Sequence, residues 1–220
     1  MDNLINFVVK YGYDLKDELT YNSYRTWKRS ETRTFDSISI TELLNLIEDK
    51  NMELVKRFNS DKMQEACDNW TKYHKWLEDY ANWEKLEIHN LNINFKTACV
   101  KYWIKNLVPE KDYSITYKEL PLLTWKLDAI CKIWKEWFVL DYKTSAGVRN
   151  FKSLKYNLQM AWYRYLSWRN KSALLYLNNK NYSFQETDNN NAYDIMFLEL
   201  LEYANTLFIN NKINNLYIKN

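Results

Sequence analysis

The chain has 220 residues, of which 46% are hydrophobic and 17% aromatic, and a formal net charge of +3. A chain of this length buries about 70% of its unfolded surface, and its aromatic bulk excludes an intrinsically disordered protein. The small net charge excludes binding to a polyanion by overall charge alone, so such binding would require clustered cations.

Glycine and proline are scarce, with two residues of each in the whole chain. Because a sheet-rich fold with many tight turns needs more of both, the scarcity favours helices joined by Asn, Asp and Ser turns. We therefore predict an all-α fold, a compact multi-helix bundle of about seven to nine helices with an aromatic-rich core. This bundle is expected to form a single helical domain over 1–220, with a soft division near 109–121.

The first 60 residues contain one well-defined helix start. Apolar residues recur at loosely helical spacing over 2–30, and 26–35 is predicted to be a cationic loop. Ser39 followed by Glu42 matches a capping box, in which each side chain satisfies a backbone amide at a helix start. Apolar residues then continue at helical spacing, which predicts a helix over about 40–59.

Three further helices are predicted between residues 61 and 140. Aromatic residues at steps of three and four place a core-facing stripe on a helix over about 61–88. A helix over 95–107 is expected to end before Pro109. Thr116 and Glu119 form a second capping-box pattern, followed by a helix that begins near Pro121 and ends near Leu140.

The segment 142–185 is the most one-sided part of the chain, with eight cations and no acidic residue. A helix over 149–171 would place an apolar stripe on one side and an exposed strip about 30 Å long on the other. Lys and Arg can contact phosphates, while Tyr rings can stack on bases. A solvated helix face without a partner is the alternative interpretation. The candidate nucleic-acid-binding residues are Arg149, Lys152, Lys155, Tyr156, Tyr163, Arg164 and Lys171.

The C-terminal part is expected to contain a polar loop over 178–191, then a last helix capped by Asn191 and a frayed tail. Cys67, Cys99 and Cys131 are spaced by 32 residues each, which is a candidate helical repeat. The odd number of cysteines, with no secretory signal, indicates free thiols in a reducing compartment. We expect a cytoplasmic protein, inside the host cell if it is viral, and no membrane association, because no apolar run approaches 18 residues.

No catalytic signature is present. Only two histidines occur, His74 and His89, so neither a Ser–His–Asp arrangement nor a zinc site is indicated. His74 and Glu78 share a helix face but have no identifiable third ligand. Gly147 alone cannot form a phosphate-cradling loop. We therefore expect no cofactor and no metal site.

These observations favour a non-enzymatic protein that docks the basic, aromatic face of 149–171 on nucleic acid or on the nucleic-acid groove of a nucleoprotein complex. The composition is consistent with a virus or mobile element. The alternative is a protein–protein assembly or inhibitor subunit, in which the same face meets an acidic protein surface. A more remote alternative is a metal-dependent nuclease that uses scattered carboxylates.

Overall fold

The computed structural model describes residues 2–10, 12–17, 19, 26–30, 33–49, 71–72, 75–77, 79–80, 90–144, 154–178, 180–187 and 191–218. The described residues divide into two compact units. Unit 1 comprises Met1–Val55, Asp112–Trp125 and Asn191–Asn220, and unit 2 comprises Lys56–Lys111 and Lys126–Asn190. Each unit is described by itself below.

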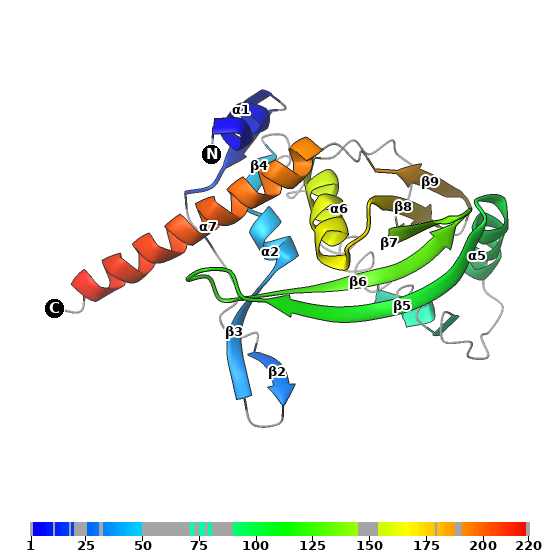
Figure 1. Cartoon of the computed structure of the whole chain (residues 1–220), viewed down its shortest axis with the longest axis horizontal. Coiled ribbons are helices and arrows are strands. Elements are labelled where there is room, and N and C mark those ends of the chain that lie inside the picture. The colour runs from blue at the N-terminus through cyan, green and yellow to red at the C-terminus, as the bar shows by residue number, and fades with distance from the viewer. Residues whose placement is uncertain are drawn as a thin grey trace. The chain divides into compact units, whose positions relative to one another are not determined.

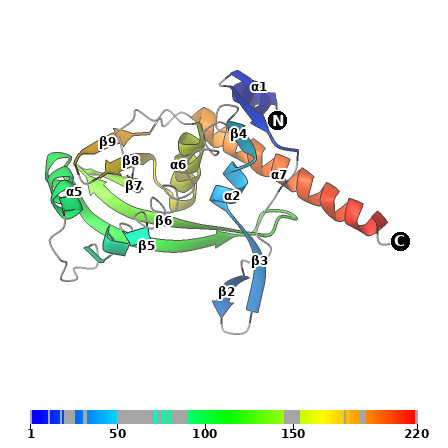
Figure 2. The ribbon, with the colours of Figure 1, turned by 180° about the vertical axis from the view of Figure 1, so that it is seen from behind.

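Unit 1 is built from short strands and three helices, α1 (Asp2–Lys10), α2 (Ile40–Leu44) and α7 (Asn191–Ile218). Strands β1 (Tyr13–Leu15) and β4 (Ile47–Asp49) pair antiparallel. Strands β2 (Thr26–Ser30) and β3 (Arg33–Ser39) form an antiparallel hairpin, and the end of β3 pairs parallel with the beginning of β6. Helices α1 and α2 both contact α7 (Figures 1 and 2).

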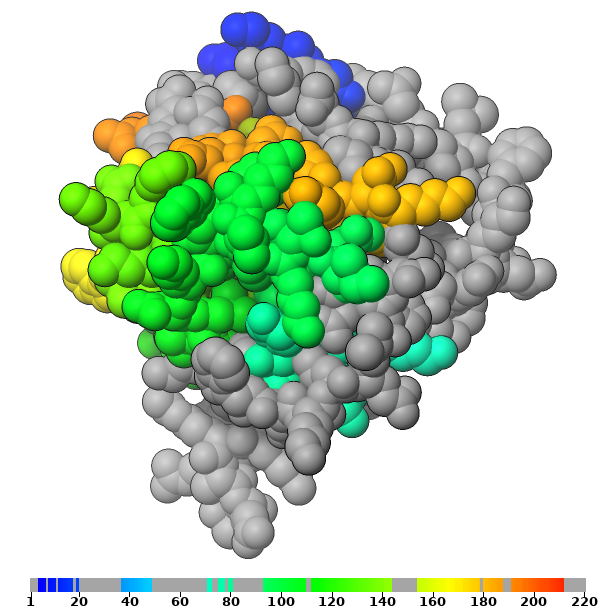
Figure 3. All heavy atoms as spheres, turned by 90° about the vertical axis from the view of Figure 1, so that its right-hand side faces the viewer, coloured from blue at the N-terminus to red at the C-terminus, as the bar shows by residue number. Residues whose placement is uncertain are grey.

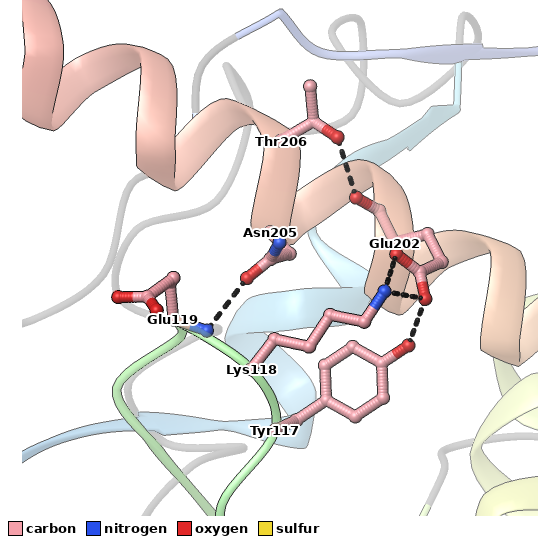
Figure 4. Close-up of polar contacts among 6 residues, drawn as sticks. All are labelled: Tyr117, Lys118, Glu119, Glu202, Asn205 and Thr206. Carbon is pink, nitrogen blue, oxygen red and sulfur yellow. Dashed lines mark hydrogen bonds and ion pairs between the residues drawn. The ribbon is translucent and has the colours of Figure 1, made fainter.

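Polar contacts with α7 hold the turn that joins β5 to β6. Glu202 accepts hydrogen bonds from the Tyr117 hydroxyl and the Lys118 ammonium, each at 2.5 Å, and Asn205 accepts one from the Glu119 amide at 3.0 Å (Figure 4). The Thr206 hydroxyl donates to the Glu202 carbonyl, one helical turn back. The turn is therefore tied to the helix by three successive residues.

Unit 2 is a sheet covered by a helix on each face. Its elements are α5 (Asn90–Lys101), β5 (Ile104–Ile115), β6 (Leu122–Ile133), β7 (Glu136–Thr144), α6 (Leu154–Ser167), β8 (Lys171–Leu177) and β9 (Tyr182–Glu186). Strands β5 and β6 pair with each other and continue from one unit into the other. Strand β6 pairs antiparallel with β7, β7 parallel with β8, and β8 antiparallel with β9.

The alternation of side chains along β6 and β7 separates the two faces of this sheet. Alternate residues such as Cys131, Phe138 and Leu140 form a buried cluster with Phe95 and Ala98 of α5. The residues between them point to the other face, against which α6 lies on β7 and β8 (Figures 1 and 2). A parallel β7–β8 pair needs a crossover, and α6 provides it.

The prediction of an all-α bundle is wrong, because nine strands lie among the described residues. The scarcity of glycine was misleading, since residues other than glycine adopt the left-handed conformation here. Among the described residues, Trp103, Lys118, Trp134 and Trp168 do so at turns or helix ends, and Asn106 does so within β5. The predicted helix near 121–140 is instead the β6–β7 hairpin, and its alternating burial along β6 fits a strand period of two.

Other predicted elements differ in extent. The Ser39–Glu42 capping box is confirmed, but α2 ends at Leu44 and does not continue to 59. The helix predicted to end before Pro109 ends at Lys101, so Pro109 lies in β5. The predicted polar loop over 178–191 contains β9. Helix α7 begins at Asn191 and extends to Ile218, where a frayed tail was expected.

The predicted helix over 61–88 lies largely outside the described residues, as do Cys67, His74, Glu78, His89 and Gly147. Cys99 is in a helix and Cys131 in a strand, so their spacing marks no repeated element. Within the described part of the chain, no helix has the length and apolar character needed to cross a membrane.

Candidate active site

Two carboxylates lie on neighbouring strands of unit 2, on the face covered by α6. In the β6–β7 register Ala129 is opposite Leu140, so Asp128 lies beside Asp141 and both side chains leave the same face of the sheet. The backbone amide of Tyr142 donates to Asp128 Oδ2 at 2.6 Å, which fixes that carboxylate against β7. Asp128 and Asp141 thus lie one step beyond the last paired residues, Ala129 and Leu140, and the side chain of Asp128 ties it to β7.

Lys143 adds a cation to this pair. It lies two residues after Asp141, so its side chain leaves the same face of β7, and its Nζ is 2.6 Å from Asp141 Oδ2. The side chain of Asp141 is 5% exposed and that of Lys143 is 19% exposed. Burial by itself lowers the pKa of Lys143, but Asp141 and, to a smaller extent, Asp128 raise it above its ordinary value, so the ammonium stays charged.

Helix α6 contributes aromatic and amide groups above the carboxylates. Gln159 Nε2 donates to the Tyr163 hydroxyl oxygen at 2.9 Å, one helical turn apart. Burial raises the pKa of Tyr163, and so do the nearby Asp141 and Asp128, so this phenol keeps its proton and can donate a hydrogen bond. The ring of Tyr156 lies over Lys143, with Nζ 4.8 Å from the ring centroid.

We call Asp128, Asp141 and Lys143, with Gln159 and Tyr163 above them, the carboxylate–lysine cluster. The formal charges of these two carboxylates and one ammonium sum to −1, which favours an additional cation. Carboxylate oxygens are the ligands that hard divalent cations prefer, and Mg²⁺ is often held by one or two carboxylates together with substrate phosphates. Among the described residues no group of three or more His, Cys, Asp and Glu side chains could hold a metal ion.

The described cysteines do not offer an alternative nucleophile. Burial raises the pKa of the Cys99 thiol to about 12 and that of the Cys131 thiol to about 12. The reactive form of cysteine is the thiolate, so both groups stay protonated and inert near neutral pH.

The structure separates the residues predicted for the basic strip. Arg149 and Lys152 lie outside the described residues. Lys155 and Tyr156 are half-buried in the first turn of α6. Lys171 is not in the helix but begins β8, where its Nζ pairs with Glu136 at 2.5 Å.

Two of the predicted residues are buried, contrary to the expectation of an exposed strip. Tyr163 faces the carboxylate–lysine cluster and is 5% exposed. Arg164 is also 5% exposed, and its Nη1 donates to the Ser172 hydroxyl at 2.9 Å. The helical wheel placed both outside because it assumed a narrow apolar stripe, whereas α6 buries a wider part of its surface that includes Met160 to Arg164. The predicted helix over 149–171 also ends earlier, at Ser167.

Sequence reasoning overlooked Asp128 and Asp141, and counted Lys143 only as one cation of a basic run. A signal was available, because Asp141 and Lys143 follow an apolar strand-like run at a spacing of two, which puts them on one face of a strand. Recognising it required the segment to be identified as a strand, which the helical interpretation of 121–140 prevented.

No family model matches this sequence, and no curated protein matches it. A solved structure described as "Crystal structure of SSO0001" is similar to this chain, with 16% sequence identity and a TM-score of 0.41, over 94% of this chain and 85% of that one. A likeness at this level carries no functional argument, so the site is interpreted from its own geometry.

Proposed function

We propose that this protein is a divalent-metal-dependent enzyme that hydrolyses phosphodiester bonds of nucleic acid at the carboxylate–lysine cluster. The observation that carries the proposal is the placement of Asp128, Asp141 and Lys143 on one face of the β6–β7 pair, with Nζ of Lys143 2.6 Å from Asp141. The proposal keeps the nucleic-acid partner expected from the sequence and replaces the non-enzymatic role with a catalytic one.

The chemistry of phosphodiester hydrolysis suits these groups. A water attacks phosphorus, the bond from phosphorus to the leaving oxygen breaks, and the leaving oxygen takes a proton. Negative charge increases on the non-bridging oxygens, so cations next to the phosphate lower the barrier. A divalent cation held by Asp128 and Asp141 would supply much of that charge and activate the water.

The protein's own residues have distinct roles in this proposal. Lys143 stays charged and can contact a phosphate oxygen, as a point charge typically does. Tyr163 keeps its proton and, fixed by Gln159, acts as a positioning residue for the carboxylates. The side chain of Lys143 is 19% exposed and that of Asp141 is 5% exposed, so a phosphate would approach the pair from the side of Lys143.

The test is cleavage of end-labelled single- and double-stranded DNA and RNA by the purified chain with Mg²⁺ or Mn²⁺, compared with EDTA. We expect metal-dependent cleavage, and a loss of about 100-fold or more in Asp128→Asn, Asp141→Asn and Lys143→Met, because each removes several kcal/mol of transition-state stabilisation. Calorimetry should show weaker binding of Mn²⁺ to both Asp→Asn variants than to the wild type.

Glu136→Gln is the matched control, because Glu136 is an exposed carboxylate on the same strand and pairs with Lys171. It should leave cleavage unchanged. Absence of metal-dependent cleavage by a folded wild-type chain would refute the proposal. A folded chain that neither binds nor cleaves nucleic acid would favour the assembly or inhibitor subunit instead.

A further inference from the structure

Three exposed tryptophans of unit 2 adopt a backbone conformation that bulky residues avoid. Among the five described non-glycine residues with positive φ are Trp103 (56°), Trp134 (57°) and Trp168 (55°). Their exposed fractions are 50%, 70% and 91%. Left-handed backbone is costly for residues with a Cβ, and a bulky residue there is an outlier that suggests a local requirement for that side chain.

Two of these side chains form a pair, although they are distant in sequence. Trp103 follows the end of α5, and Trp134 is the first residue of the two-residue turn between β6 and β7. Their rings are stacked, with centroids 5.4 Å apart and an interplanar angle of 23°. Each position is one where glycine or asparagine is normally preferred. The pair therefore presents exposed indole surface at this end of the unit 2 sheet.

Two cations lie near this indole pair. Lys105 Nζ lies 5.2 Å from the centroid of a Trp103 ring. Lys96 of α5 lines the same hollow as Trp103, and residues 90–109 include no acidic residue. The ammonium of Lys101 lies instead over the rings of Tyr102 and Tyr182. In Figure 3, the green atoms of α5 and the start of β5 lie beside the yellow-green atoms of the β6–β7 hairpin, so the cationic and indole-bearing segments share one face of unit 2.

A hollow of about 500 Å³ adjoins the pair. Its lining includes Tyr80, Val100 and Trp103, together with Lys96 and Lys105. Cavities of this size with apolar walls and a few polar groups are typical of small-molecule and nucleotide-sized ligands. The surface thus offers ring faces, an adjoining apolar hollow and positive charge together.

We propose that the Trp103–Trp134 pair binds unpaired bases of single-stranded nucleic acid, with Lys96 and Lys105 contacting the phosphates. Bases stack on aromatic side chains irrespective of sequence, and a cationic surface follows the backbone. Bases paired in a duplex are already stacked on their neighbours and cannot reach the indoles. This inference deepens the proposed function, on which it rests for the choice of nucleic acid.

The position of the pair is compatible with one strand reaching the carboxylate–lysine cluster. Trp134 lies six residues after Asp128 on β6, which corresponds to about 20 Å along a strand. A single strand with a rise of about 3.4 Å per stacked nucleotide covers this distance in about six nucleotides. Because α5 and the cluster lie on opposite faces of the unit 2 sheet, a strand held by the pair would have to pass around the hairpin end of the sheet to reach the cluster.

The test measures binding separately from cleavage. Anisotropy of a fluorescein-labelled oligothymidine of about 15 nucleotides, a length that matches known single-strand sites, is titrated with the full chain in EDTA. Trp103→Ala and Trp134→Ala should each weaken binding about 10-fold or more, since stacking on an aromatic ring contributes this much per base. Trp134→Phe should restore much of the affinity, and a duplex of the same length should bind weakly and respond little to either change.

Trp168→Ala is the matched control, because it removes another exposed, left-handed tryptophan of the same unit that follows α6. Its affinity should equal that of the wild type. Equal affinity of the wild type, Trp103→Ala and Trp134→Ala would overturn the inference, as would equal losses for single strand and duplex, or no oligonucleotide binding by the folded chain.

The outcome is separable from that of the proposed function. Asp141→Asn should bind the oligothymidine as the wild type does while losing cleavage. Tryptophan-dependent binding by a chain without metal-dependent cleavage would support the indole pair and refute the nuclease. Cleavage of single strands that is unaffected by both tryptophan changes would support the nuclease and refute the pair.

Discussion

Left-handed residues show at the smallest scale why composition misled the prediction of fold. Two glycines were taken to mean few tight turns, but Trp134 makes the β6–β7 turn and Lys118 lies in the β5–β6 turn, both with positive φ. The conformational cost, about 1–2 kcal/mol for each residue with a Cβ, is offset by the packing of the elements they connect. Composition reflects the average conformational preferences of the residue types, and tertiary contacts at a particular position can outweigh those preferences.

The end of α6 allows this cost to be measured. Trp168 follows Ser167 with φ of 55°; its amide donates to the Tyr165 carbonyl and the Arg169 amide donates to that of Arg164, which is the Schellman pattern that normally has glycine. Trp168→Gly should raise the free energy of unfolding by about 1 kcal/mol, because glycine adopts this conformation without a steric penalty. Urea denaturation measures the change.

Trp168→Ala provides the comparison, since alanine also lacks the indole but keeps the Cβ and hence the left-handed cost. Its stability should remain close to that of the wild type. If the glycine variant were no more stable than the alanine variant, the backbone of Trp168 would carry no such cost.

The elements themselves were predicted best where their signal is local. The Ser39–Glu42 capping box correctly located the beginning of α2, because both hydrogen bonds form within four residues of sequence. The end of α2 was wrong, because residues 47–49 pair with β1, which is remote in sequence. Helical spacing of Leu and Ile after Leu44 was compatible with either outcome until that pairing was known.

The contribution of the capping box can be tested directly. Ser39 Oγ accepts from the Glu42 amide at 3.2 Å, and the Ser39 amide donates to the Glu42 carboxylate at 2.8 Å. Ser39→Ala should lower the free energy of unfolding by about 1 kcal/mol, because a helix amide loses its partner. Chemical denaturation followed by circular dichroism checks this value.

Two control variants show whether a loss of stability in Ser39→Ala comes from the helix cap. Thr41→Ala, at an exposed position inside α2, should have little effect, and Ser39→Asp should keep most of the stability because aspartate also caps helices. A loss in Thr41→Ala as large as that in Ser39→Ala would show that the hydroxyl of Ser39 has no special role.

At the scale of the molecule, the stability of unit 1 should depend on pH through Glu202 and Tyr117. Hydrogen bonds from Lys118 and then Tyr117 lower the pKa of Glu202, whereas burial and then the bond to Glu202 raise the pKa of Tyr117 to about 12. Glu202 stabilises the folded state at pH values above the pKa of an unfolded glutamate, and this contribution is lost as the pH falls through the lowered pKa of Glu202 in the folded state. Tyr117 stabilises the folded state at pH values below the pKa of an unfolded tyrosine, and this contribution is lost as the pH rises toward 12.

Thermal unfolding measured from acidic to alkaline pH reports both contributions. Glu202→Gln should lower the melting temperature at neutral pH and reduce the loss of stability on acidification. The loss of unfolding free energy at neutral pH should be at most about 1 kcal/mol, because exposed ion pairs are screened. Tyr117→Phe should lessen the decline at high pH. A wild-type acid limb that is unchanged in Glu202→Gln would assign it to other carboxylates.

The candidate site was only partly accessible from the sequence. The acid-free segment 142–185, which the sequence singled out, contains Lys143, Tyr156 and Tyr163 of the proposed site. Asp128 and Asp141 are 13 positions apart in sequence, and nothing local indicates that they share a site. Their meeting depends on the β6–β7 register, and the position of Tyr163 above them depends on the β7–α6–β8 crossover.

By itself, the sequence determined what short-range chemistry controls: a chain able to bury a core, the beginnings of α2 and α7, and a concentration of cations after Asp141. Only the tertiary structure decided that 122–144 forms two strands, that Arg164 is buried, and that Asp128, Asp141 and Lys143 share one face. The physical reason is that apolar spacing in short segments fits a helix and a strand almost equally. The choice between them is made by hydrogen bonds and burial contributed by residues remote in sequence.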